Sequence, residues 1–206
     1  GDVYKRQAQM RAEYSGVPLR AIAQLAKSWN FSEASFGMAA LNSYYATPSV
    51  ADENGFALAD APWPHIFDPF RNAVAGKKVA VIGHFPFAPK ALNQAADFYM
   101  LERSLNDGDY PDSAAEYILP ECDYVFITGS AFVNKTAPRL LELSGESFNV
   151  VLGPSTPLAP VLLEDYGVSQ VTGMVPTSPL AMFEGLSGTD AGTTMFDWGH
   201  RVELSA

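Results

Sequence analysis

The chain has 206 residues, 48% apolar and only 17% charged, so we expect a globular protein with a sizeable core and exclude a disordered chain. Its 23 acidic and 13 basic residues give a net charge of −10 without any Lys/Arg cluster, which argues against a surface for nucleic acid or anionic membrane. One cysteine excludes an internal disulfide framework and a Cys-based zinc site, and no apolar stretch approaches the roughly 20 residues that span a bilayer.

These bounds predict a cytoplasmic protein that binds a small-molecule or metal ligand, with homo-oligomer formation left open. The first seven residues, Gly1–Gln7, are polar and lack the apolar segment of a signal peptide. They fit no pattern in the rest of the chain. We therefore expect them to be a remnant of cloning or sequence assembly, and the natural protein to begin further upstream.

Two helices are predicted in the first fifth of the chain. Apolar residues recur at helical spacing from 17 to 29, and a second helix is predicted over 32–45 with Ser32 as its N-cap. Its small residues indicate close helix packing. Gly37, Ala40 and Asn42 are expected to form a face of this helix that packs against another element. Because two helices cannot form a stable domain alone, residues 8–72 are interpreted as a small, truncated helical or α+β domain with its linker.

The end of that part, residues 47–72, is rich in proline and carries scattered acids, which is typical of a linker or an irregular segment with at most a short strand. Its aromatic content is too high for a free tether. We therefore expect it to pack across the junction with the next domain.

From Gly76 onward, short apolar runs alternate with short helical segments. The predicted strands are 78–82, 97–101, 123–127, 148–152 and 168–174, the predicted helices are 89–96, 112–119, 132–143, 158–165 and 179–186, and the tail 193–204 is assigned to edge strands. The strand from 78 to 82 shows no polar alternation, which is typical of a parallel sheet covered on both faces. Residues 73–206 are therefore predicted to form a doubly wound, mainly parallel, Rossmann-like α/β domain.

Ligands of open parallel sheets bind just beyond the carboxyl ends of the strands. The residues predicted to gather there are Gly83, His84 and Phe85, Glu102, Thr128, Gly129 and Ser130, and Gly153, Pro154, Ser155 and Thr156. Small residues allow a close approach of backbone to ligand, and helix N-termini that follow such turns favour an anion. The alternative is that Gly and Ser merely form tight strand-to-helix turns.

A dinucleotide site is not expected at these strand ends. Glu102 has the spacing of the ribose-binding acid, but Gly83-His-Phe-Pro-Phe-Ala places bulky residues where a glycine-rich phosphate turn needs small ones, and Pro86 lacks an N–H donor. Neither NAD nor FAD is therefore predicted. The phosphate-loop, G-x-S-x-G and H-E-x-x-H motifs are absent from the sequence.

His84 is the best single candidate for a metal ligand, with oxygen ligands available at Glu102, Asp107, Asp109 and Asp112. The alternative is that this acidic loop is simply solvated. His84 is also a candidate general base, since its ordinary pKa lies near neutrality. Ser130 and Ser155 are candidate nucleophiles only because of their positions at strand ends. Cys122 is assigned to the inert core, and His65 and His200 are assigned to packing or to the surface.

Several ordered motifs resemble the "putative heavy-metal chelation" family of unknown function. They are Val79–Phe87 (VAVIGHFPF), Leu101–Arg103, Gly108-Asp109 with Pro111, Leu119-Pro120, Ile127–Ser130 with Asn134 and Thr136, Gly153–Pro157, and, more weakly, Gly37–Asn42. The resemblance implies a Rossmann-like domain preceded by a small domain similar to the enolase N-terminal fold. It also implies a site in the cleft between them, a role in handling metal and a proposed link to corrin synthesis. Strands expected before the first helix are missing from this sequence.

Together these observations predict a protein that binds or processes a divalent or heavy-metal ion or an anionic metal chelate. His84 and Glu102 are the predicted metal-contacting and catalytic candidates. The strand-end turns, with Asn134 and, from the small domain, Asn42, are predicted to bind the ligand. One alternative is a metal-independent enzyme that acts on a small phosphorylated or nucleotide-like substrate. The other is a non-catalytic regulatory or interaction module whose cleft is filled by its own side chains, such as Phe85 and Phe87.

Overall fold

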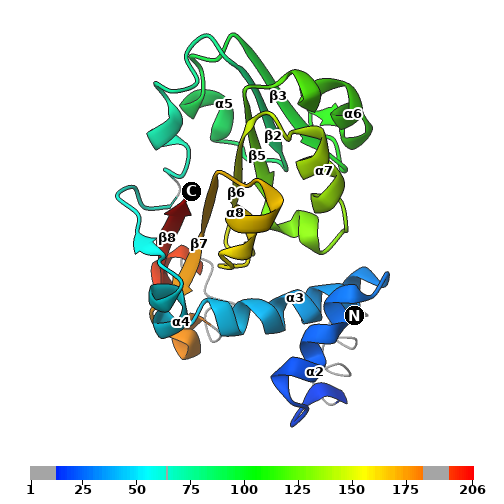
Figure 1. Cartoon of the computed structure of the whole chain (residues 1–206), viewed down its shortest axis with the longest axis vertical. Helices are drawn as coiled ribbons and strands as arrows, with labels where there is room; N and C mark the ends of the chain where they lie inside the picture. The colour runs from blue at the N-terminus through cyan, green and yellow to red at the C-terminus, as the bar shows by residue number, and fades with distance from the viewer. Residues whose placement is uncertain (1–12, 64, 183–194) are drawn as a thin grey trace.

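A computed structural model of the chain describes residues 13–63, 65–182 and 195–206 (Figure 1). The predicted remnant Gly1–Gln7 lies outside the described residues, and so does the second half of the helix predicted over 179–186, of which 179–182 are helical.

The centre of the molecule is an eight-stranded sheet in the order β1-β8-β7-β6-β5-β2-β3-β4. Its parallel strands are β2 (Lys78–Ile82), β3 (Asp97–Glu102), β4 (Tyr110–Pro111), β5 (Tyr124–Thr128), β6 (Phe148–Leu152) and β7 (Gln170–Pro176). The strands β8 (Gly199–Ser205) and β1 (Ala57–Leu58) extend one edge in antiparallel fashion. The prediction of a doubly wound, mainly parallel α/β sheet is confirmed.

The two faces of the sheet are covered by different elements, as Figure 1 shows. One face packs against α4 (Pro48–Glu53), α6 (Ala115–Ile118), α7 (Ala137–Leu143) and α8 (Val161–Tyr166). The other packs against α5 (Ala88–Ala91) and the segment 66–74, which contains the 3₁₀ turn η2 (Asp68–Phe70). Further 3₁₀ turns are η3 (Asp112–Ala114), η4 (Leu119–Glu121), η5 (Gly129–Phe132) and η6 (Met195–Trp198). The central strands are buried on both faces, which explains their unbroken apolar sequence.

The N-terminal helices are α2 (Leu19–Ala23), continued by η1 (Gln24–Lys27), and α3 (Phe31–Tyr45). The predicted close packing is present: a Cβ on Gly37 would lie 1.9 Å from the backbone nitrogen of Ala26. The predicted cap is wrong. Asn30, not Ser32, caps α3, because the Asn30 side chain accepts the Ser32 backbone N–H at 3.0 Å.

Helix α3 crosses the carboxyl-end edge of the sheet (Figure 1). Near its start, the Phe31 ring lies 5.9 Å from the guanidinium carbon of Arg103, just after β3. Near its end, the Asn42 side chain donates to the carbonyl oxygen of Ser155, after β6, at 2.8 Å. A single helix therefore spans the rim at which ligands of such sheets bind.

Several predicted helices are shorter than expected. The helix predicted over 89–96 is α5 (Ala88–Ala91), and the one predicted over 158–165 is α8 (Val161–Tyr166). The helix predicted over 17–29 ends at Ala23, continues as a 3₁₀ turn to Lys27 and buries no residue fully. The helix predicted over 132–143 begins only at Ala137, because the Asn134 side chain accepts the Thr136 backbone N–H and holds a turn there.

The proline-rich segment 47–72 is not a free tether. It contains α4 and the edge strand β1, and its Ile66, Phe67 and Phe70 are buried against the sheet. The division into domains at residues 72 and 73 remains a prediction. In the described part of the chain, the helices are too short or too polar for any of them to cross a membrane.

Candidate functional site

The turns that follow β2, β5 and β6 lie against one another at the carboxyl-end rim. A Cβ on Gly83 would lie 3.2 Å from the Thr128 side chain. A Cβ on Gly129 would lie 2.5 Å from the Thr156 backbone nitrogen, and one on Gly153 would lie 3.9 Å from the Gly129 nitrogen. The structure therefore brings together the predicted site residues of these three turns, and glycine is required where their backbones touch.

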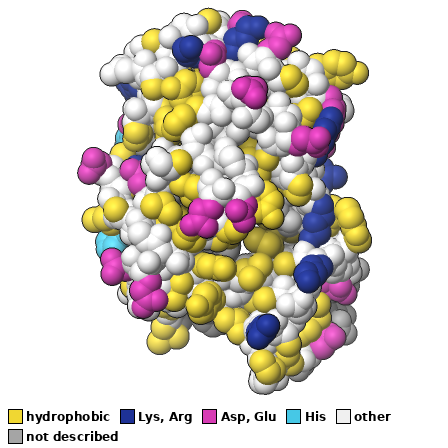
Figure 2. All heavy atoms as spheres, viewed as in Figure 1, with side chains coloured by type: hydrophobic (Ala, Val, Ile, Leu, Met, Phe, Trp, Pro, Cys, Tyr) yellow, Lys and Arg dark blue, Asp and Glu magenta, His cyan; other side chains and the backbone are white. Residues whose placement is uncertain are grey.

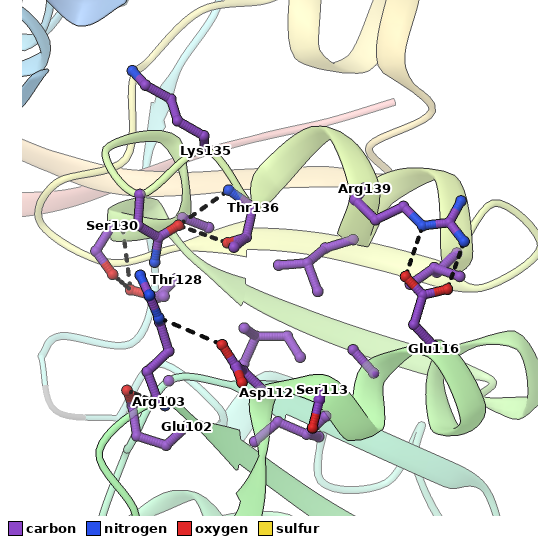
Figure 3. A pocket seen from close by; sticks show the side chains of 18 residues that line it. Glu102, Arg103, Asp112, Ser113, Glu116, Thr128, Ser130, Lys135, Thr136 and Arg139 are labelled. Atoms are coloured by element: carbon purple, nitrogen blue, oxygen red, sulfur yellow. Dashed lines mark hydrogen bonds and ion pairs between the residues drawn. The ribbon is translucent and has the colours of Figure 1, made fainter. Parts of the chain in front are cut away.

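A pocket of about 390 Å³ opens at the carboxyl ends of the neighbouring strands β2 and β5, with β3 beside them, between α6 and α7 (Figure 3). This is the point at which the strand order reverses, where open α/β sheets bind ligands. Its apolar side chains are Ile82, Leu101, Ala115, Ala131, Leu140 and Leu143, and its polar and charged ones are Glu102, Arg103, Asp112, Ser113, Glu116, Thr128, Ser130, Asn134, Lys135, Thr136 and Arg139. The pocket combines an apolar surface with a polar rim, which suits a small organic ligand.

The uncharged polar groups of this pocket are arranged in pairs. The hydroxyls of Thr128 and Ser130 lie 3.1 Å apart. Asn134 accepts the Thr136 backbone N–H at 3.1 Å and its hydroxyl at 2.7 Å through one side-chain oxygen. Among the described residues, the Asn134 Nδ2 group has no hydrogen-bond partner, so it is available to donate to a ligand.

The charged groups divide into engaged and open ones. Arg139 donates to Glu116 at 2.9 and 2.5 Å and lies 2.7 Å from Glu142, which closes one end of the pocket (Figure 3). Hydrogen bonds from Arg139 hold the pKa of Glu116 below its usual value. Arg103 makes a single, longer contact, from Nε to Asp112 Oδ2 at 3.4 Å.

Lys135 points away from this pocket (Figure 3). Its backbone has a φ of 68°, the only positive φ of a non-glycine residue in the described ranges. Its Nζ donates to the carbonyl oxygen of Ala26, so it ties the N-terminal helices to the sheet-bearing part. A second, more open pocket beside this contact is lined by Ala26, Lys27, Trp29, Met38, Phe132, Lys135 and Pro138. In Figure 2 apolar side chains border the hollow between the N-terminal helices and the sheet-bearing part of the molecule.

His84 forms a pair with a buried carboxylate. Its Nδ1 lies 3.0 Å from Asp109 Oδ2, and the Asp109 side chain is fully buried while that of His84 is 33% exposed. Burial raises the pKa of Asp109, but hydrogen bonds from Asn106 and His84 lower it further, so the net pKa is below the usual value. The expectation of a merely solvated acidic loop does not hold for Asp109.

Glu102 lines the pocket but directs both oxygens to neighbouring backbone groups. Oε2 accepts the His84 N–H at 3.0 Å and Oε1 accepts the Arg103 N–H at 2.8 Å. In the part of the chain that the structure describes, no three His, Cys, Asp or Glu side chains form a cluster suited to hold a metal ion. His84 and Glu102 are thus brought together through the His84 backbone, and the imidazole turns to Asp109.

The other predicted residues lie beside the pocket rather than in it. Phe85 packs in an aromatic cluster with Phe67 and Phe87 on the opposite face of the sheet, so these rings do not fill the pocket. Asn42 and the Gly153–Thr156 turn, including Pro154, meet at the far end of the rim. Cys122 is buried, and burial raises the pKa of its thiol to about 11, as expected for an inert core cysteine.

Comparison with known proteins identifies the family. The model of the DUF364 family, described as "Putative heavy-metal chelation", matches residues 65–202, well over half of the chain. The chain belongs to the DUF364 family. A second model, DUF4213, with the same description, matches residues 4–45. The resemblance inferred from the sequence motifs is confirmed.

Solved structures support this membership. The chain is 43% identical to a DUF364 protein of unknown function from Desulfitobacterium hafniense DCB-2, with a TM-score of 0.82 over 93% of this chain and 75% of that one. A DUF364 protein of unknown function from Pyrococcus horikoshii shares the fold, with 24% identity and a TM-score of 0.74 over 91% of this chain and 75% of that one. An uncharacterized protein of Methanocaldococcus jannaschii is 27% identical over 71% of this chain, which spans 56% of that relative's length.

Some residues of this candidate site were not predicted from the sequence. Arg103 and Thr136 belong to motifs that resemble the family but were assigned no role, and neither Glu116 nor Arg139 was predicted. Glu116 and Arg139 come from α6 and α7, helices that converge only in the folded sheet, so 23 residues of chain separate the members of this ion pair. Arg103 could have been singled out, since it directly follows Glu102 at the carboxyl end of the same strand.

Proposed function

We propose that this DUF364 chain binds a metal ion carried by a small organic chelator at the carboxyl ends of its parallel strands, with His84 supplying one nitrogen ligand. The family description supports metal binding in general terms. The finer proposal rests on the arrangement of the His84 ring and on the adjacent pocket.

The His84–Asp109 pair is the observation that carries the proposal. An ionised carboxylate can only accept a hydrogen bond, and the low pKa of Asp109 keeps it ionised at neutral pH. The ring proton of neutral His84 therefore resides on Nδ1, which leaves the Nε2 lone pair unprotonated. Histidines that bind metals typically donate their other ring N–H to a carboxylate in this way.

The organic part of the ligand would occupy the pocket at the strand ends, whose lining begins one residue before His84. Gly83, which directly precedes His84, lines the pocket, and so does Glu102, which accepts the His84 backbone N–H. The chelator would supply most of the metal's ligands, and the imidazole would complete its coordination. Imidazole suits zinc, copper, iron and nickel among the transition metals.

The test uses the untagged protein and nickel nitrilotriacetate, a chelate that leaves coordination positions open for imidazole. We expect calorimetric binding by the native chain, a loss of about tenfold or more in His84→Ala, and a loss of about tenfold in Asp109→Asn. His65→Ala is the matched control, because His65 forms a similar pair with Asp68 at 2.8 Å but on the open surface. Equal affinities in the native chain and His84→Ala would show that His84 is not the ligand.

A second function is favoured by the same pair. A histidine whose Nδ1–H is held by a buried carboxylate is also the arrangement of a general base, so His84 could take a proton from a bound substrate without any metal. A thermal-shift panel of small phosphorylated compounds and nucleotides, recorded in the presence of EDTA, distinguishes this function. Thermal stabilisation by such a compound that needs no metal and disappears in His84→Ala would favour the metal-independent enzymatic function.

A further inference from the structure

We propose that the pocket between α6 and α7 binds an organic molecule with a carboxylate group, and that Arg103 is the residue that recognises this group. The inference deepens the proposed function and depends on it only for the statement that the ligand is the organic part of a chelate. The geometry of the Arg103 guanidinium is its basis.

The Arg103 guanidinium has N–H donors that make no hydrogen bond within the described residues. Its Nε lies 3.4 Å from Asp112 Oδ2, and its guanidinium carbon lies 5.9 Å from the centre of the Phe31 ring. Within the described ranges, neither of its terminal nitrogens has a hydrogen-bond partner, and the side chain is half exposed. A planar guanidinium with a free edge is well suited to bind a carboxylate through two parallel hydrogen bonds.

Other donors line the same pocket. In Figure 3 the Arg103 guanidinium is directed toward the part of the pocket that holds Thr128 and Ser130. Their hydroxyls and the unpartnered Asn134 Nδ2 group can donate to the same oxyanion or to a neighbouring polar group of the ligand. The apolar side chains of the pocket, including Leu101 and Leu140, would contact the carbon skeleton.

The charge balance of the pocket favours one negative charge over two. Of the three cations that line it, Arg139 is engaged by Glu116 and Glu142, and Lys135 points away to Ala26. Only Arg103 is left with open donors, whereas three acids line the same space. A phosphate dianion would meet more repulsion there than a carboxylate would.

Phe31 contributes from the other side of the rim. Its position at the start of α3 places an aromatic ring against the guanidinium, an interaction that favours a fixed arginine orientation. The residue that recognises the carboxylate is therefore contacted by the N-terminal helices, although it directly follows strand β3 of the sheet.

The experiment compares 4-phenylbutyrate with its neutral amide, 4-phenylbutanamide, on the full chain in EDTA, by protein-observed NMR titration. We expect the acid to bind about tenfold more tightly than the amide. Arg103→Gln should reduce the affinity for the acid to that for the amide, and Arg103→Lys should retain part of the difference. Arg71→Gln is the matched control, because Arg71 is equally exposed and forms a similar single contact with Asp68 at 3.3 Å.

Equal affinities for acid and amide, or an undiminished preference in a folded Arg103→Gln protein, would overturn the proposal. Tighter binding of phenyl phosphate than of the acid would overturn the assignment to carboxylates. Because the probes carry no metal, acid selectivity through Arg103 together with a failed nickel titration would reject the proposed function alone. Nickel binding through His84 without acid selectivity would reject this inference alone.

Discussion

The side chain of Asn42 donates to the carbonyl oxygen of Ser155 at 2.8 Å, although 113 residues separate them in the chain. This bond joins the helix that crosses the rim to the turn after β6. Further contacts between the N-terminal helices and the rest of the molecule are Phe31–Arg103, Lys135–Ala26 and the packing of Tyr45 against the core.

Replacement of Asn42 by alanine should loosen this junction. The Ser155 carbonyl would lose its donor, and we expect the free energy of unfolding to fall by about 1 kcal/mol in urea titrations. Asn54→Ala is the control, since Asn54 makes a longer bond of 3.4 Å to the Leu158 carbonyl and should matter less. A larger effect at Asn54 than at Asn42 would contradict this view of the junction.

Gly129→Ala should be more destabilising than an ordinary glycine substitution. The new Cβ would lie 2.5 Å from the Thr156 backbone nitrogen, so the turns after β5 and β6 would have to separate. We expect a loss of about 1–3 kcal/mol in thermal or urea unfolding. Gly145→Ala provides the comparison, because its Cβ would have ordinary contacts of 3.6 Å and its φ is not positive. Similar stabilities of the two variants would show that the turns can part at little cost.

Lys135 allows backbone strain to be separated from side-chain contact. Lys135→Ala and Lys135→Gly both remove the contact with the Ala26 carbonyl, but only glycine adopts a φ of 68° without strain. We therefore expect the glycine variant to be more stable than the alanine variant by about 1 kcal/mol in urea titrations. The opposite order would indicate that this turn changes conformation once the lysine is lost.

Asp109 should make stability depend on acid pH. Its pKa is lower in the folded chain than the ordinary 3.8, so its stabilising contribution is fully present above pH 3.8 and is lost as the pH falls through the folded pKa. Asp109→Asn should therefore show a shallower loss of unfolding free energy as the pH falls below about 3.8. Asp68→Asn, on the exposed His65 pair, serves as the control, and an equal change there would contradict this prediction.

The fold was predictable because its strands are buried on both faces. The run Val79–Val81 is fully buried, and such unbroken apolar sequences are recognisable without any alignment. The two-residue strand β4 has no comparable pattern, since it pairs with β3 through Tyr110 and Pro111 only. The start of α7 was missed because the Asn134 side chain competes with the helix, an effect that apolar spacing does not reveal.

The position of the candidate site was predictable, but the contacts between its side chains were not. Parallel topology alone requires the ends of β2, β3, β5 and β6 to share one edge, so the site residues of those turns could be assigned together. The acid that faces His84 could not be predicted, because five acids follow His84 within 28 residues and only the fold of the 106–109 turn selects Asp109. Glu102 was expected at a metal, but its oxygens accept two backbone N–H groups, which residue type does not disclose.

Asp109 also accepts the backbone N–H and the side-chain amide of Asn106, at 3.0 and 3.2 Å, while it holds the His84 ring. One carboxylate thus closes a surface loop and sets the direction of an imidazole. Any event that pulls on the ring, such as coordination of a cation, changes how firmly that loop is closed. Amide hydrogen exchange in residues 104–108 would consequently report occupancy of a site that those residues do not themselves line.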